Sequence, residues 1–149
     1  MALLRAVFVA LLLLPLAAGG AGAMEKHRLA LQISDNDPAK MNAVLNVAAN
    51  VSKYYSDKGD EVEIQIVAFN AGLTMLRADK SPVLERLKSV SKDVPNITFE
   101  ACHNTLEGMA KKEGKAASDI PLVSGTKVVP AGVVELMELN EAGWTVVRP

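Results

Sequence analysis

The single cysteine of the chain, Cys102, lies where a strand-like run meets a helix-like run, in the stretch ITFEACHNTLEGMA (residues 97–110). The first residue of a helix faces unpaired backbone amides and the positive end of the helix dipole, and both favour a thiolate over a thiol. The two following residues, His103 and Asn104, could donate hydrogen bonds to an anionic sulfur. The pattern therefore indicates a reactive cysteine. Cysteine is also among the most frequently buried residue types, so an inert packing role is the alternative.

The residues beside the cysteine also have plainer interpretations. His103 could be a solvated surface side chain, because neighbours in sequence often point apart, and Asn104 and Thr105 could simply cap the helix. Other kinds of site find no support in the sequence. Two histidines and one cysteine give no zinc-ligand spacing, no Cys-x-x-Cys pair offers a dithiol cycle, and no phosphate-binding loop is present. We therefore expect neither a metal nor a cofactor.

The first 23 residues, MALLRAVFVALLLLPLAAGGAGA, have the pattern of a secretory signal peptide. Arg5 precedes an apolar run from Ala6 to about Ala18, and Ala21–Ala23 offers the small residues that a signal peptidase recognises. The run is shorter than the roughly 20 apolar residues that span a bilayer, and an uncleaved membrane anchor is the alternative. The pattern predicts a periplasmic or secreted protein that has no membrane contact once the signal is removed.

Removal of these 23 of the 149 residues leaves 126, numbers 24–149, which is enough for one domain with a hydrophobic core. The loss of Arg5 leaves 15 basic and 17 acidic side chains, a net charge of −2. Since no basic block is present, this balance excludes nucleic acid as a partner. A lone cysteine in an exported protein cannot form an internal disulfide, so it indicates a free thiol or an intermolecular bridge.

Apolar periodicity divides the domain into alternating strands and helices behind a short mobile lead-in at Met24–His27. The expected strands are 28–33, 62–69, 97–101, 126–130 and 144–149, and the expected helices are 37–59, 81–94, 104–112 and 131–143. In the last helix we expect Val133, Leu136 and Met137 to be buried. Such alternation predicts an α/β fold, a three-layer α/β/α domain with a mostly parallel five-stranded sheet.

Ligands of open parallel sheets bind beyond the carboxyl ends of the strands. Four such ends can be read from the sequence: Ser34–Asp37, Asn70–Gly72, Cys102–Asn104 and Pro130–Gly132. We therefore expect Asn70 and the amides near Gly72 and Gly132 to gather around Cys102, together with His103 and Asn104.

Three short stretches resemble the DsrE/DsrF-like family: FEACHNTL (99–106), VVPAGVVELMELNEAGW (128–144) and AFNAGLTML (68–76). The resemblance covers residues 28–148 and implies the YchN-like fold for the single domain 24–149. It also implies that the protein carries sulfur as a persulfide on Cys102 and passes it to other proteins. The resemblance further implies a homo-oligomer, either a dimer, a trimer or a hexamer. The chain resembles the exported branch of the family in two respects. It has an export signal, and it has HNTLEGMAKKEG after the cysteine where sulfur-relay members have a basic Arg-Arg-Gly stretch.

Together these features predict an exported sulfur carrier or thiol-redox protein, a persulfide-carrying sulfurtransferase whose partners are sulfur donor or acceptor proteins. Two alternatives remain. One is a non-catalytic oligomeric binding module in which Cys102 only packs. The other is an accessory protein of a sulfur-oxidation system.

Overall fold

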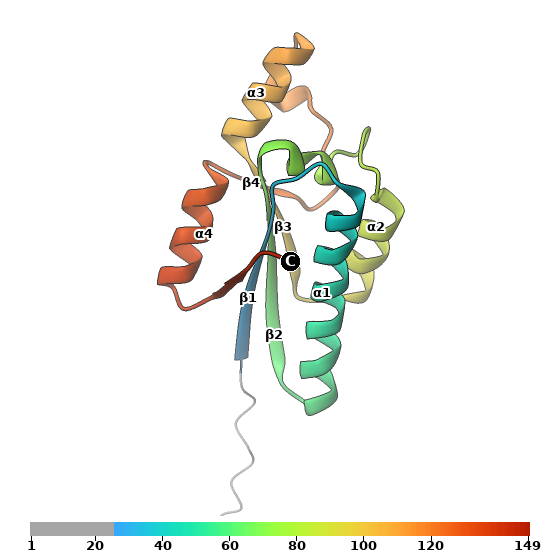
Figure 1. The fold of residues 1–149 in the computed structure, drawn as a ribbon, viewed down its shortest axis with the longest axis vertical. Coiled ribbons are helices and arrows are strands. Elements are labelled where there is room, and N and C mark those ends of the chain that lie inside the picture. Colours follow the sequence, from blue (N-terminus) through green and yellow to red (C-terminus); the bar gives the residue numbers. More distant parts are fainter. Residues whose placement is uncertain (1–25) are drawn as a thin grey trace, which may run out of the picture.

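Five runs rich in β-branched and apolar residues form one parallel sheet in the computed structural model, which describes residues 26–149 (Figure 1). The strands are β1 (Lys26–Ile33), β2 (Glu61–Ala68), β3 (Ile97–Cys102), β4 (Lys127–Val129) and β5 (Thr145–Val147). Their order in the sheet is β4-β3-β2-β1-β5, and every neighbouring pair is parallel. The predicted α/β class and parallel five-stranded sheet are confirmed.

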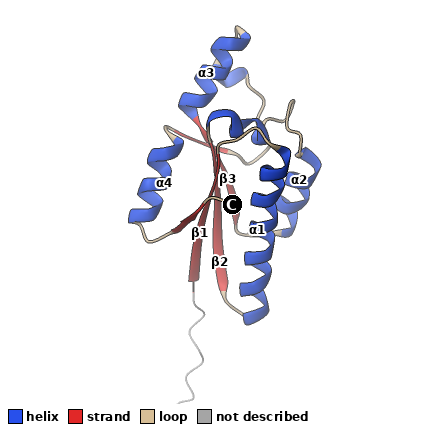
Figure 2. Cartoon of the chain, in the orientation of Figure 1, coloured by secondary structure: helices blue, strands red, loops and turns tan. Residues whose placement is uncertain are grey.

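Helices cover both faces of the sheet, as right-handed crossovers between parallel strands require (Figure 2). Helices α1 (Pro38–Lys58) and α2 (Leu84–Asp93) lie on one face, and α4 (Gly132–Glu141) lies on the other. Helix α3 (His103–Glu113) extends beyond the carboxyl end of the sheet. Two short 3₁₀-helices, η1 (Asn70–Leu76) and η2 (Ala117–Asp119), complete the connections.

The helix boundaries follow from local chemistry. The side chain of Asp37 accepts a hydrogen bond from the Ala39 amide at 2.8 Å and caps α1, whose first residue is Pro38. Gly59 ends α1 and Gly114 ends α3, both in the left-handed conformation that glycine adopts without a steric penalty. The caps of α1 agree with the helix predicted at 37–59, whereas α2 begins at Leu84, three residues after its predicted start.

The two faces of the sheet differ in polarity. Side chains two residues apart on a strand point to the same face, and Leu29, Leu31, Ile64 and Ile66 accordingly build one apolar face with almost no exposed surface. On β3 the opposite face carries Glu100 and Cys102, both buried. Glu100 interacts electrostatically with Glu135 of α4, so Cys102 also faces the α4 side of the sheet.

Two expectations about the elements are wrong. Lys26 and His27 were expected in a mobile lead-in, yet they pair with Glu61 and Val62 in β1, because β2 is long enough to extend the ladder. In α4, Val133 and Met137 were expected to be buried but are 54% and 57% exposed. The helix instead buries a stripe three and four residues apart, Gly132, Leu136 and Leu139.

This rotation of α4 leaves an apolar surface stripe, Val133, Val134 and Met137, each at least half exposed in the described chain. The predicted signal peptide, residues 1–23, lies outside the described residues. Within residues 26–149 no helix combines the length and apolar character needed to span a membrane.

Candidate functional site

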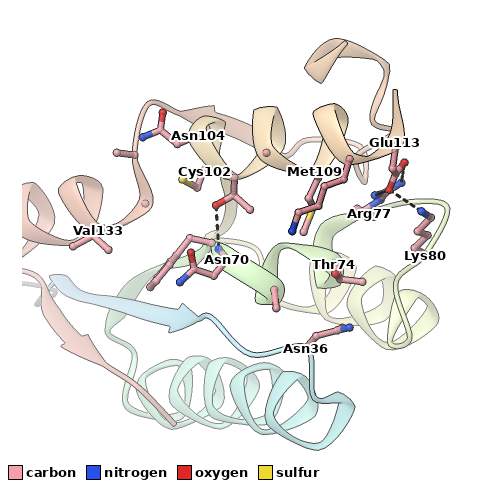
Figure 3. A pocket seen from close by; sticks show the side chains of 17 residues that line it. Asn36, Asn70, Thr74, Arg77, Lys80, Cys102, Asn104, Met109, Glu113 and Val133 are labelled. Atoms are coloured by element: carbon pink, nitrogen blue, oxygen red, sulfur yellow. Dashed lines mark hydrogen bonds and ion pairs between the residues drawn. The ribbon is translucent and has the colours of Figure 1, made fainter. Parts of the chain in front are cut away.

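A cavity of about 930 Å³ lies at the carboxyl end of the sheet, beside the full length of α3 (Figure 3). All four predicted strand ends contribute to its wall, because the carboxyl ends of parallel strands share one edge of the sheet. Asn36 follows β1, Asn70 follows β2, and Gly132 follows β4. Cys102 ends β3 and Asn104 lies in the first turn of α3. The structure thus brings together Cys102, Asn104, Asn70 and Gly132.

Two of the predicted site residues lie elsewhere. His103 is on the outer side of α3, where its imidazole is half exposed and 3.4 Å from the carboxylate of Glu107. Gly72 packs against the end of β1, and a Cβ atom at this position would lie 2.4 Å from the carbonyl oxygen of Ile33. Neither residue belongs to the cavity wall.

Cys102 lines the cavity and is only 6% exposed. Burial raises the pKa of this thiol, but hydrogen bonds from the Thr105 hydroxyl and from the amides of Gly132, Thr105 and Asn104 outweigh burial and lower the pKa overall. The amides of Asn104 and Thr105 are unpaired donors of the first turn of α3, and the Gly132 amide starts α4. Two helix amino ends therefore converge on one sulfur atom and favour its thiolate form.

The orientation of the Thr105 hydroxyl depends on the loop after β2. The amide of Asn70 donates to Thr105 Oγ1 at 3.0 Å, which leaves the hydroxyl hydrogen free to point at the sulfur. Asn70 has a φ of 50°, the left-handed region that asparagine tolerates better than most residues. The sequence suggested only a capping role for Thr105, because its partner Asn70 lies 35 residues away in the chain.

Replacing Thr105 with valine should slow alkylation of Cys102 near neutral pH by about tenfold, because a hydrogen bond to a charged group contributes about 1.5 kcal/mol. The loss of this donor raises the pKa of the Cys102 thiol and so reduces the thiolate fraction. The pH dependence of iodoacetamide labelling measures both quantities. Thr105→Ser retains the hydroxyl and should label like the wild type. Identical pH profiles for Thr105→Val and wild type would rule out this role.

The absence of a side chain at Gly132 allows a close approach to Phe69. A Cβ atom at Gly132 would lie 3.0 Å from Cβ and 3.1 Å from Cδ1 of Phe69, a separation tighter than ordinary side-chain contacts. Glycine therefore allows the start of α4 to approach the end of β2 closely enough for its amide to reach the sulfur.

The far end of the cavity from Cys102 is lined by charged side chains that the sequence did not indicate (Figure 3). The guanidinium of Arg77, which is 2% exposed, donates to Asp79 at 2.9 and 2.7 Å and also to both carboxylate oxygens of Glu113. Lys80 and Lys115 bind the same Glu113 carboxylate at 2.7 and 2.8 Å. Hydrogen bonds from Arg77, Lys115 and Lys80 hold the pKa of Glu113 well below its usual range.

This network was missed because Arg77 and Glu113 are 36 residues apart and neither belongs to a known short motif. The only available signal was an arginine directly after a mostly apolar stretch, NAGLTML, which is consistent with a buried charge. In residues 26–149, no group of three or more His, Cys, Asp or Glu side chains is arranged to hold a metal ion.

Comparisons with known proteins agree on the fold. No protein-family model matches the chain, and no curated protein sequence matches it significantly. Among solved structures, a protein of unknown function from Methanobacterium thermoautotrophicum, MTH1491, is 28% identical with a TM-score of 0.63, covering 83% of this chain and 99% of its own. The ychN protein from E. coli is 17% identical with a TM-score of 0.55, covering 85% and 100%.

The agreement extends over nearly the whole length of both solved proteins, so it concerns the complete domain and not a single motif. One of the three stretches that carry the sequence resemblance, FEACHNTL, places the cysteine after the third strand, and Cys102 lies at the end of β3. The chain therefore has the YchN-like fold.

Proposed function

We propose that this protein is a sulfur carrier that holds sulfane sulfur as a persulfide on Cys102. The observation that supports this most directly is the place of Cys102 in the wall of a large cavity, at the amino end of α3, where the Thr105 hydroxyl and the amides of two helix starts lower the pKa of its thiol. Such donors stabilise an anionic sulfur, and a persulfide is more acidic than a thiol and so benefits in the same way. Three of these groups are backbone amides of helix starts, and the Thr105 hydroxyl is the one side chain among them.

The proposed reaction needs no external oxidant or reductant. The Cys102 thiolate attacks the outer sulfur of a donor such as thiosulfate, a new S–S bond forms, and the bond to the sulfonate sulfur breaks. Sulfite leaves with the electron pair, and Cys102 becomes a persulfide anion. An acceptor thiolate then attacks the outer sulfur, takes it as its own persulfide, and returns Cys102 to the thiolate.

The test is release of thiocyanate by cyanide after incubation with thiosulfate or polysulfide and removal of the excess donor. Wild type should release about one thiocyanate per chain, because one cysteine is present. Cys102→Ser, which is close in size, should release none. Equal release from the two proteins would end the proposal.

The 6% exposure of Cys102 favours a second candidate, a non-catalytic binding module in which the thiol only packs. Alkylation of the native protein distinguishes the two. A carrier should label fast relative to the same protein under reducing denaturing conditions at equal pH, whereas an inert buried thiol should label far more slowly when folded.

The proposed carrier acts after export and as a homo-oligomer. The signal sequence supports export, and the stripe of Val133, Val134 and Met137 supports self-association, since adjacent exposed apolar side chains favour contact with another subunit. Light scattering on the protein lacking residues 1–23 measures its mass. A monomer at micromolar concentration would refute the oligomer.

A further inference from the structure

The cavity is much longer than transfer of one sulfur atom requires. Three lining residues of α3, Asn104, Gly108 and Lys112, are spaced four apart and therefore lie on one side of the helix. At about 1.5 Å per residue, the cavity runs about 12 Å along α3 from Asn104 to Lys112. Its volume of about 930 Å³ is at the upper end of the range of pockets that bind organic molecules.

The charge in the cavity is concentrated at the end opposite Cys102. Among the lining residues, Arg77, Lys80 and Lys112 are cationic and only Glu113 is anionic, a local net charge of +2 in a chain whose net charge is −1. Arg77 and Lys80 are bound to Glu113. The ammonium group of Lys112 has no ion-pair or hydrogen-bond partner in residues 26–149. A cationic wall with one uncommitted lysine attracts an anion.

Gly108 keeps the space between the two ends open. It lies in the interior of α3, where glycine is less favourable than alanine, and its backbone does not have a positive φ. A Cβ atom at Gly108 would meet no atom within 4 Å outside the local helix backbone. Packing therefore does not require glycine here, whereas a large side chain at this position would project into the cavity between Cys102 and Lys112.

We propose that the cavity binds an extended organic anion, a thiol or thiol persulfide with a carboxylate about 10 Å from its sulfur, and that Lys112 binds this carboxylate while the sulfur reaches Cys102. The reaction of the bound sulfur with Cys102 rests on the proposed carrier function, whereas binding of the carboxylate by Lys112 does not. In the transfer step, the Cys102 thiolate attacks the outer sulfur of R–S–SH. A new S–S bond forms between Cys102 and this outer sulfur, the S–S bond of the donor breaks, and the thiolate R–S⁻ leaves with the electron pair. The outer sulfur keeps its proton.

The first experiment compares two donors of different length on the whole protein. Glutathione persulfide carries carboxylates far from its sulfur, whereas in thiosulfate the charge is adjacent to the sulfur. Lys112→Gln should lower the second-order rate with glutathione persulfide by about fivefold, less so at high salt, and change the thiosulfate rate by less than about twofold. Lys111→Gln removes the same charge from the same helix turn but outside the cavity, and should change neither rate. An equal loss with both donors, or with both variants, would overturn the inference.

The second experiment does not depend on sulfur transfer. Calorimetry with S-methylglutathione on Cys102→Ser should detect binding, which Lys112→Gln weakens by about fivefold and Gly108→Leu abolishes. Circular dichroism establishes whether Gly108→Leu keeps its fold; should it unfold, the Lys112→Gln arm alone decides. Binding that neither variant changes, or no binding at all, would refute the extended-anion site. Binding without any transfer to wild-type Cys102 would refute only the carrier function.

Discussion

Gly72→Ala should destabilise the protein by about 3 kcal/mol, at the upper end of what one extra methyl group costs in a packed interior. The new Cβ atom would lie 2.4 Å from the carbonyl oxygen of Ile33, 2.6 Å from its carbonyl carbon and 2.8 Å from Cα of Ser34. All three are backbone atoms. The Ile33 carbonyl also accepts a hydrogen bond from the Phe69 amide at 3.1 Å, so neither β1 nor η1 can shift without breaking it.

Urea denaturation measures this change, and Gly108→Ala is the matched control. The same methyl group at Gly108 meets no atom within 4 Å outside the local helix backbone and lies inside α3. It should therefore stabilise the protein by about 0.5–1 kcal/mol through helix propensity. If the two alanine variants change the free energy of unfolding in the same direction, the close approach of η1 to β1 is not the reason for glycine at position 72.

Glu100→Gln should make the stability of the protein less sensitive to pH, by about 3 kcal/mol between about pH 4 and pH 9. Glu100 is 3% exposed on β3 beneath α4. Burial, and to a lesser extent the charge of Glu135, raise the pKa of Glu100 from 4.5 to about 7, while Lys127 opposes the rise. With its amide nitrogen turned towards Glu100, Gln65 donates to both carboxyl oxygens at 3.2 Å.

The direction follows from proton binding. Because the pKa of Glu100 in the folded protein, about 7, exceeds its ordinary value of 4.5, the folded state binds this proton more tightly than the unfolded chain. The resulting stabilisation is fully present below about pH 4.5 and is lost as the pH rises through about 7. Glutamine is neutral at every pH in this range. The free energy of unfolding of Glu100→Gln should therefore rise relative to that of the wild type as the pH increases.

Chemical denaturation of both proteins across this pH range measures the difference. Glu135→Gln removes the neighbouring charge and lowers the pKa of Glu100, so it should flatten the pH dependence only partly. Parallel stability curves for the wild type and Glu100→Gln would show that Glu100 does not bind its proton more tightly in the folded state.

Short-range sequence patterns determined the order of the elements and the position of the cysteine. Caps such as Asp37 and Gly59 act within a few residues, and apolar spacing depends only on the geometry of a helix or strand. Alternating elements then restrict the topology to a parallel sheet, and the end of β3 must lie at the edge where ligands bind. For this reason the sequence predicts that Cys102, Asn104, Asn70 and Gly132 lie at one edge of the sheet, and all four line one cavity there.

The same patterns predicted the wrong buried face for α4. Val133, Leu136 and Met137 recur at three and four, as a buried stripe would, yet only Leu136 is buried. An apolar helix such as α4 offers more than one stripe of this spacing, and the sequence alone does not say which one meets the sheet. The face that meets the sheet is the one that carries Gly132, which lies close to Phe69 at the start of the helix.

Only the tertiary structure decided which groups act on the sulfur and which line the cavity opposite it. The bond from Asn70 to Thr105 joins residues 35 apart, and Arg77 and Glu113 are 36 apart. Such contacts depend on how complete elements pack against one another, and no local spacing encodes that packing. Local sequence thus determined where the thiol would be. Long-range packing determined that it would be buried, that its pKa would be lowered, and that it would share a cavity with Lys112, an unpaired lysine at the other end of α3.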